Sequence, residues 1–294
     1  MLIIYHDADM DGICSGAIAH MKYPEARLLG HDYKRDFDIE WVQPGEDVIM
    51  ADISLPMPLM QQIAERSSSF LWLDHHVSAL KEYEEYFDLT AGTHNTLGHE
   101  KMTYIYRSDI SACEICWTEL FPGQVMPESV HMLGEYDTWR GNGSDRWNNV
   151  ILPFQYGMRV AGFTPEILAY FLKNSQTNQE VIMVGQSILL YQASQDKRLM
   201  EKSFDARLNI PAENGVIRCL VCNGAYNSIA FESKWNEDKY DAMVGISFDG
   251  KMWGISLRTT KDIDLSVIAK SFGGGGHKQA AGCGVDDLRK ILVW

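Results

Sequence analysis

Three short apolar runs in the first third of the chain each end in acidic or histidine residues. The runs are "LIIY", "VIMA" and "FLWL". The polar residues that follow them are, in chain order, His6, Asp7, Asp9, Asp11, Asp52, Asp74, His75 and His76. Compact apolar runs of this length are typical of buried strands in a parallel sheet. Because parallel strands end at one edge of the sheet, we expect these polar side chains to converge there.

Helix-like segments alternate with these runs, at about residues 12–22, 56–66 and 108–120. This alternation predicts a doubly wound α/β domain with a parallel sheet. A long segment that is polar on one side and apolar on the other predicts a helical linker over residues 176–205. Beyond it, "GVIRCLVCN" and "DAMVGISFDGKMWGISLRTT" read as strands, with a hairpin turn at "FDGK". We therefore expect an N-terminal domain over 1–175, the linker, and a smaller α/β domain over 206–294.

The convergence of so many carboxylates has a cost, since they repel one another unless cations compensate. Carboxylate and imidazole donors together suit Mn²⁺, with Zn²⁺ or Fe²⁺ as alternatives and an all-oxygen Mg²⁺ site less favoured. "DADMDG" does not fit a calcium loop, because the twelfth position counted from Asp7 is Ile18 rather than a glutamate. On residues alone, the "DHH" triplet fits three metal ligands, a catalytic pair with its orienting acid, or a polar loop.

The formal net charge of −14 disfavours binding to long duplex nucleic acid, which relies on basic side chains. A small anionic substrate remains compatible if positive charge or metal is concentrated locally. The sequence shows neither a signal-peptide pattern nor an apolar run of membrane-spanning length, so we expect a cytoplasmic protein without membrane contact. Two CxxC spacings lie too far apart for a zinc ribbon, which favours reduced, packed thiols.

The order of four motifs, "YHDADMDG", "ADIS", "LDHH" and "EYDTW", resembles motifs I to IV of the DHH phosphoesterase superfamily. The segment "LRTTKDIDLSVIAKSFGGGGHKQAAGC" resembles the DHHA1 domain of that superfamily, including its "GGGGH" signature. The size and layout are similar to those of the small two-domain members, which include nano-RNases, pAp phosphatases and cyclic-dinucleotide hydrolases. The resemblance implies a DHH catalytic domain, a helical linker and a DHHA1 substrate-binding domain.

The resemblance also implies a site with two divalent metal ions, most simply Mn²⁺. One ion would be held by His6, Asp9 and Asp52, and Asp7 competes with His6 as the first ligand. The second ion would be held by four residues, namely Asp11, Asp52, His75 and Asp137. Asp52 would then bridge the two ions. The catalytic roles would fall to His76, which would contact phosphate or move a proton, and to Asp74, which would orient its neighbours.

The glycine run near the C-terminus is the expected substrate contact. Its members, Gly273, Gly274, Gly275 and Gly276, let consecutive backbone N–H groups turn toward an anion. His277 and Arg258 would add donors suited to phosphate. The alternatives are that Gly273 only ends a helix and the rest is a flexible loop, and that Arg258 is a surface cation.

These features favour an enzyme, a Mn²⁺-dependent phosphodiesterase of nuclease or oligoribonuclease type. It would hydrolyse short oligonucleotides or dinucleotides with water activated at two metals. One alternative is a phosphomonoesterase acting on pAp, or a polyphosphate or pyrophosphate hydrolase related to exopolyphosphatases. A nucleotide sensor without activity is disfavoured, because every expected ligand position holds a competent residue. A homodimer is left open.

Overall fold

The structure is a computed structural model, and it describes residues 1–88, 100–172, 177–210, 216–224 and 228–294. The chain divides into two compact units, Met1–Leu189 and Leu190–Trp294. The division falls within helix α8 (Asn178–Met200), inside the segment expected to link two domains. The exact domain limits of 175 and 206 stay a prediction. Among the described residues, no helix has the length and apolar character needed to cross a membrane.

The described residues of the first unit form a five-stranded parallel sheet in the order β2-β1-β3-β4-β5. Its strands are β1 (Leu2–His6), β2 (Arg27–His31), β3 (Asp47–Ala51), β4 (Ser69–Asp74) and β5 (Met102–Tyr106). The three apolar runs of the sequence are β1, β3 and β4, which lie side by side. The predicted α/β class with a parallel N-terminal sheet is confirmed.

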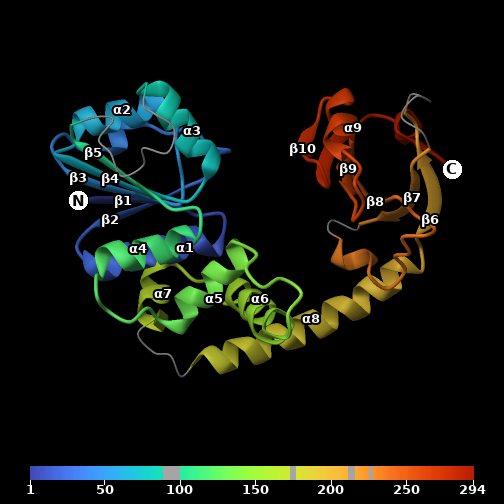
Figure 1. Ribbon diagram of the computed structural model, residues 1–294, viewed down its shortest axis with the longest axis horizontal. Helices are drawn as coiled ribbons and strands as arrows, with labels where there is room; N and C mark the ends of the chain where they lie inside the picture. Colours follow the sequence, from blue (N-terminus) through green and yellow to red (C-terminus); the bar gives the residue numbers. More distant parts are fainter. Residues whose placement is uncertain (89–99, 173–176, 211–215, 225–227) are drawn as a thin grey trace. The chain divides into compact units, whose positions relative to one another are not determined.

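Helices cover both faces of this sheet, because side chains alternate between the faces along each strand. Ile3 and Ile49 pack in one core with α1 (Met10–Lys22) and α4 (Ala112–Leu120). Ile4 and Met50 pack in the other core with α2 (Met57–Arg66) and α3 (Val77–Tyr86). Figure 1 shows α2 and α3 on one side of the strands and α1 and α4 on the other. The remaining helices of this unit are α5 (Glu128–Asp137), α6 (Leu152–Val160) and α7 (Pro165–Leu172).

The helices predicted at 12–22, 56–66 and 108–120 form, but two begin elsewhere for local reasons. Helix α1 starts at Met10 because the Asp9 side chain caps it, accepting a hydrogen bond from the Gly12 N–H at 3.0 Å. Helix α4 starts at Ala112, where Ser111 and Glu114 form a capping box.

The described residues of the second unit form a seven-stranded sheet in the order β10-β11-β9-β8-β7-β6-β12. Its elements are β6 (Phe204–Leu208), β7 (Arg218–Asn223), β8 (Ala242–Phe248), β9 (Trp253–Arg258), α9 (Leu265–Ser271), β10 (Gly275–His277), β11 (Ala280–Val285) and β12 (Leu292–Val293). The predicted hairpin joins β8 to β9, which pair antiparallel, and its turn places Gly250 at a φ of +98°. All six cysteines are free and buried, as expected for packed thiols.

Candidate metal centre

Asp52 lies at the middle of the candidate site, directly after the central strand β3. Its side chain is buried, and its backbone has a φ of +59°. A left-handed conformation costs a non-glycine residue on the order of 1–3 kcal/mol, although aspartate tolerates it better than most. The N–H of Asp52 still donates to the Leu73 carbonyl of β4 at 3.0 Å, so the sheet holds the residue in place. The fold thus keeps a strained, buried carboxylate between two histidine-bearing strands.

One group of candidate ligands lies on the β1 side of Asp52. The His6 Nδ1 atom is 3.0 Å from Asp9 Oδ2 and 3.6 Å from Asp52 Oδ2. Gly12 permits this arrangement, because a Cβ atom there would lie 2.1 Å from the His6 carbonyl oxygen. The candidate ligand atoms of His6, Asp9 and Asp52 all lie within 4.8 Å of one another.

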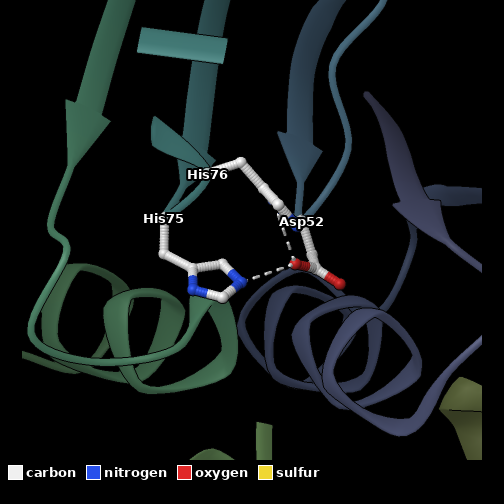
Figure 2. A group of neighbouring side chains, drawn as sticks. All are labelled: Asp52, His75 and His76. Atoms are coloured by element: carbon white, nitrogen blue, oxygen red, sulfur yellow. Dashed lines mark ion pairs between the residues drawn. The ribbon is translucent and has the colours of Figure 1, made fainter. Parts of the chain in front are cut away.

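A second group lies on the β4 side. The His75 Nε2 atom is 3.3 Å from Asp137 Oδ2, 3.5 Å from Asp52 Oδ1 and 3.8 Å from Asp11 Oδ2. Figure 2 shows His75 and His76 directed at the same carboxylate oxygen of Asp52. Since the other oxygen of Asp52 faces His6, its two oxygens face two different donor groups. The structure thus brings together six residues that the sequence predicted as ligands.

Helix α4 fixes the carboxylate of Asp11. Its two oxygens accept hydrogen bonds from the first N–H groups of this helix, at Ala112 (2.9 Å) and Cys113 (3.0 Å). A helix N-terminus favours negative charge, because its first N–H groups have no partner inside the helix. No pattern in the sequence indicated this support, since the partners are about a hundred positions apart.

Asp74 lies outside the candidate ligand groups and contacts its two histidine neighbours. Of these, His75 is a candidate ligand, and His76 lies with Asp52 and His75 in a further group of possible metal donors. Its buried Oδ1 accepts hydrogen bonds from the backbone N–H groups of His75 (2.7 Å) and His76 (3.2 Å). The same oxygen lies 2.7 Å from the His76 Nδ1 atom. The His76 side chain is 42% exposed, so its ring is oriented by Asp74 on one side and open to solvent on the other. Asp7, the competing first ligand, instead forms an ion pair with Arg35 and lies outside the ligand groups.

The charges at the site shift the pKa values of both candidate histidine ligands upward. Burial opposes protonation of His6, but the carboxylates of Asp52 and Asp9 raise its pKa to about 10. Burial likewise opposes protonation of His75, but Asp52, Asp11 and Asp137 raise its pKa to about 9. In the absence of metal, both rings therefore carry a proton at neutral pH and partly neutralise the acids.

The donor set fits divalent cations. Within the described part of the chain, the buried His6 Nδ1 and Asp52 Oδ1 atoms have no well-aligned hydrogen-bond partner. Buried polar atoms without partners are costly, and a cation held by them would remove that cost. Mixed carboxylate and imidazole donors suit Mn²⁺, Fe²⁺ or Zn²⁺ better than Mg²⁺ or Ca²⁺.

The glycine run in the second unit requires a correction to the expected anion cradle. The N–H groups of Gly273 and Gly274 donate to the carbonyls of Lys270 (3.0 Å) and Ala269 (2.9 Å), and Gly273 has a φ of +76°. This is a Schellman cap of α9, so these two N–H groups are not free for an anion. The alternative interpretation of Gly273, a helix end, is the one that the structure shows. Gly275 and Gly276 continue into strand β10 rather than into a flexible loop.

The other two expected contacts lie close together on this sheet. His277 pairs with Ala280 of β11, and Ala280 pairs with Arg258 of β9, so His277 and Arg258 lie at one level two strands apart. Arg258 is half-buried and donates through Nη1 to the Leu257 carbonyl at 2.9 Å. His277 is exposed.

Two residues near the metal centre were not anticipated from the sequence. The Tyr33 ring lies 5.5 Å from the His6 ring, and its hydroxyl accepts from the Ser54 N–H at 3.3 Å. Arg159 of α6 lines a cavity of about 230 Å³ together with Asp9 and residues of α1. Neither belongs to a motif, and only the tertiary fold brings them to the site.

Comparison with known proteins agrees with this architecture. Residues 225–292 match the DHHA1 domain family. An uncharacterized protein of Acanthamoeba polyphaga mimivirus is 24% identical over 267 residues, covering 88% of this chain and 58% of that protein. The chain thus spans less than two thirds of the length of this curated relative.

Solved structures include proteins of similar layout. The pGpG-specific phosphodiesterase PggH from Vibrio cholerae is 13% identical, with a TM-score of 0.52 over 97% of this chain and 92% of that one. RecJ from Thermus thermophilus, solved in complex with Mn²⁺, is 13% identical with a TM-score of 0.48, over 97% of this chain and 49% of that one. The first similarity shows a shared fold. With the DHHA1 match, the resemblance to the DHH/DHHA1 superfamily is confirmed.

Proposed function

We propose that this chain, which carries a DHHA1 domain and has the DHH/DHHA1 fold, is a divalent-metal-dependent phosphoesterase. Its substrates would be short oligonucleotides or dinucleotides, and its metal Mn²⁺. The observation that carries the proposal is the position of Asp52, a buried carboxylate whose two oxygens face two separate groups of metal-type donors. Such an arrangement suits a pair of ions bridged by one carboxylate.

His6, Asp9 and Asp52 would hold one ion, and Asp52 would share the second with His75, Asp11 and Asp137. When bound, a pair of divalent ions supplies an activated water and neutralises charge on a phosphoryl group. The protein would supply the rigid geometry, because α4 fixes Asp11 and the sheet fixes Asp52. Fixed donors need no rearrangement during the reaction, which is the main source of electrostatic catalysis.

The His76 ring would handle a proton at the departing oxygen or steady the phosphate. The Asp74 carboxylate accepts a hydrogen bond from the Nδ1 atom of His76. This bond orients the imidazole and raises the pKa of His76. A histidine held in this way keeps a proton available near neutral pH on its other nitrogen.

The second unit would contribute substrate contacts through Arg258 and His277, which lie at one level of its sheet. An arginine and a histidine are both suited to bind a phosphate oxygen. With two glycine N–H groups used by the α9 cap, we place the expected anion contacts on these two side chains and on Gly275 and Gly276.

A substrate panel tests the function. Purified protein with Mn²⁺ would be incubated with 5′-labelled di- to pentanucleotides, a cyclic dinucleotide, pAp, pyrophosphate and polyphosphate, and products would be resolved by chromatography. We expect the short phosphodiesters to be cleaved fastest, and EDTA to stop the reaction. Preferential cleavage of pAp or of polyphosphate would replace the diester assignment, and no turnover of any panel member would refute the phosphoesterase function.

A further inference from the structure

Trp139 occupies a backbone conformation that large side chains rarely adopt. It follows the end of α5, two residues after Asp137, and its φ is +56°. Just beyond a helix end, this left-handed position is usually filled by glycine, and a bulky residue is strained there. Strain of this kind is retained where the surrounding structure enforces it, most often at functional sites.

The turn that carries Trp139 is fixed from several directions. The Trp139 N–H donates to the Tyr136 carbonyl at 3.2 Å, and the Arg140 N–H donates to the Glu135 carbonyl at 3.0 Å. The Arg140 guanidinium also donates to Thr138 Oγ1 at 2.9 Å and pairs with the buried carboxylate of Glu114. Glu114 belongs to α4, the helix whose N-terminus holds the candidate ligand Asp11. The Trp139 turn and the metal centre therefore share one rigid support.

The Trp139 ring is both exposed and supported by other rings. Its side chain is 63% exposed, although it lies nearly parallel to Trp147, with centroids 5.7 Å apart and planes at 23°. Trp147 is in turn parallel to Tyr136, at 5.5 Å and 9°. A flat, rigid and exposed aromatic surface of this kind suits stacking by a nucleobase, which every base can do through its π-face.

A cation lies at the same cluster. The guanidinium of Arg159 lies over the Tyr136 ring, 5.4 Å from its centroid, and the same residue lines the cavity that contains Asp9. Among the described residues, no carboxylate is paired with Arg159. Its guanidinium also lies over the Tyr156 ring, 5.8 Å from the centroid. In a chain of net charge −14, an arginine held by two aromatic rings and lining the same cavity as a candidate metal ligand is suited to an anion near that ligand.

We propose that Trp139 and Arg159 form a subsite for a nucleoside phosphate, with the base on Trp139 and a phosphate oxygen at Arg159. The inference rests on the proposed function for the position of the reacting phosphate, at Asp137 and Asp9. It specifies the substrate class, because an inorganic polyphosphate or pyrophosphate has no group to place on an exposed indole.

Calorimetric titration of the Mn²⁺-loaded protein with adenosine monophosphate and with ribose 5-phosphate tests this subsite. The two probes differ only in the base, so the ratio of their dissociation constants isolates the contribution of stacking. We expect the wild type to bind the nucleotide about tenfold or more tightly, in the range found for base–aromatic stacking. Cleavage of a 5′-labelled dinucleotide by the same protein preparations, resolved by chromatography, reports turnover separately.

Three variants sharpen the result. Trp139→Gly should bring the ratio close to one while keeping or raising the melting temperature, because glycine tolerates the left-handed backbone. Trp139→Phe should retain most of the preference. Asp88→Gly, which changes another positive-φ residue at the far end of α3 from His76, should leave the ratio as in the wild type.

An equal affinity of the wild type for both probes, or an unchanged ratio in Trp139→Gly, would overturn the subsite. A base preference that depends on Trp139, in a protein that turns over no phosphoester, would keep the subsite and refute the proposed reaction. Conversely, turnover of short nucleotides without any base preference would keep the reaction and refute the subsite.

Discussion

Asp52 combines three properties that rarely coincide at one residue. It is buried, it has a left-handed backbone, and its two oxygens face different histidines. Burial alone would raise its pKa, but the imidazoles of His6 and His75 hold that pKa below the ordinary value. Asp52 therefore stays charged, as its proposed role as a bridging metal ligand requires.

Replacing Asp52 by asparagine should remove activity without unfolding the protein. Asparagine has nearly the same shape and tolerates a positive φ, but it lacks the second anionic oxygen. Removing a residue that only hydrogen-bonds to a metal ligand lowers metal affinity or activity about 10- to 100-fold. We therefore expect removal of the ligand itself to lower kcat/KM at least about 100-fold. The assay is hydrolysis of the best panel substrate, together with metal content by mass spectrometry.

Asp47→Asn is the matched control, because Asp47 lies at the other end of the same strand and its carboxylate accepts hydrogen bonds from the hydroxyls of Ser68 and Ser69. It should keep full activity. Wild-type turnover in Asp52→Asn would show that Asp52 does not bridge the ions.

The two raised histidine pKa values predict how stability responds to pH in the metal-free protein. His6 and His75 have pKa values of about 10 and about 9, above the ordinary value of 6.5. The two histidines bind protons more tightly in the folded state than in the unfolded state, so their protonation stabilises the fold. This contribution is complete below about pH 6.5 and is lost as pH rises through the pKa values of the folded state. The melting temperature in EDTA should therefore fall between about pH 6.5 and 10.

Excess Mn²⁺ should reverse this trend, because metal binding requires deprotonated histidines and becomes tighter as pH rises. Thermal unfolding followed by circular dichroism at matched pH values measures both curves. Parallel curves with and without metal would contradict the assignment of His6 and His75 as ligands.

At the scale of elements, helix α4 connects the metal centre to the turn that carries Trp139. Its first N–H groups hold Asp11, and Glu114 in its first turn pairs with Arg140 and closes the capping box with Ser111. The sequence predicted a helix over 108–120 but gave no indication of this supporting role. Its function as a support appears only when residues distant in the chain are brought together.

Glu114→Ala should destabilise the first unit, because the change removes the cap and leaves Arg140 without its partner. A lost cap and a lost hydrogen bond to a charged group each cost about 1–2 kcal/mol, so we expect the free energy of unfolding to fall by about 2–4 kcal/mol. Denaturation in urea, followed by circular dichroism, gives the value.

Glu119→Ala on the same helix is the control, since Glu119 is exposed. It should change stability by less than about 0.5 kcal/mol. Equal effects of the two substitutions would show that the buried network around Glu114 contributes nothing beyond helix propensity.

At the scale of the whole molecule, the second unit is a separate sheet with its own core, and its proposed contribution is substrate binding. His277→Ala should raise KM about tenfold, the equivalent of one hydrogen bond to a charged group at about 1.5 kcal/mol. The effect on kcat should be smaller, because His277 lies outside the metal ligand groups. Steady-state kinetics with a dinucleotide separates the two constants.

Lys278→Ala is the neighbouring control, because Lys278 is paired with Asp262. It should leave KM within about twofold of the wild type. Unchanged KM and kcat in His277→Ala would remove His277 from the substrate contacts.

The sequence by itself determined the fold class, the strand ends and the identity of the residues that meet at them. Apolar runs ending in acids and histidines need only local patterning to be recognised, and parallel strands then bring their ends together. From the local sequence, the helix end at Gly273 was only one of two interpretations. A run of glycines is compatible with both a helix cap and an anion-binding loop until the hydrogen-bond partners of its N–H groups are known.

Tertiary structure alone decided which oxygen faces which histidine, the left-handed backbone of Asp52 and Trp139, and the partnership of Asp11 with α4. It also brought Arg159 over the ring of Tyr136 and set Trp139 parallel to Trp147. These features depend on contacts between segments far apart in the chain. Their geometry is set by packing and hydrogen bonding across the fold, which no local pattern of residues encodes.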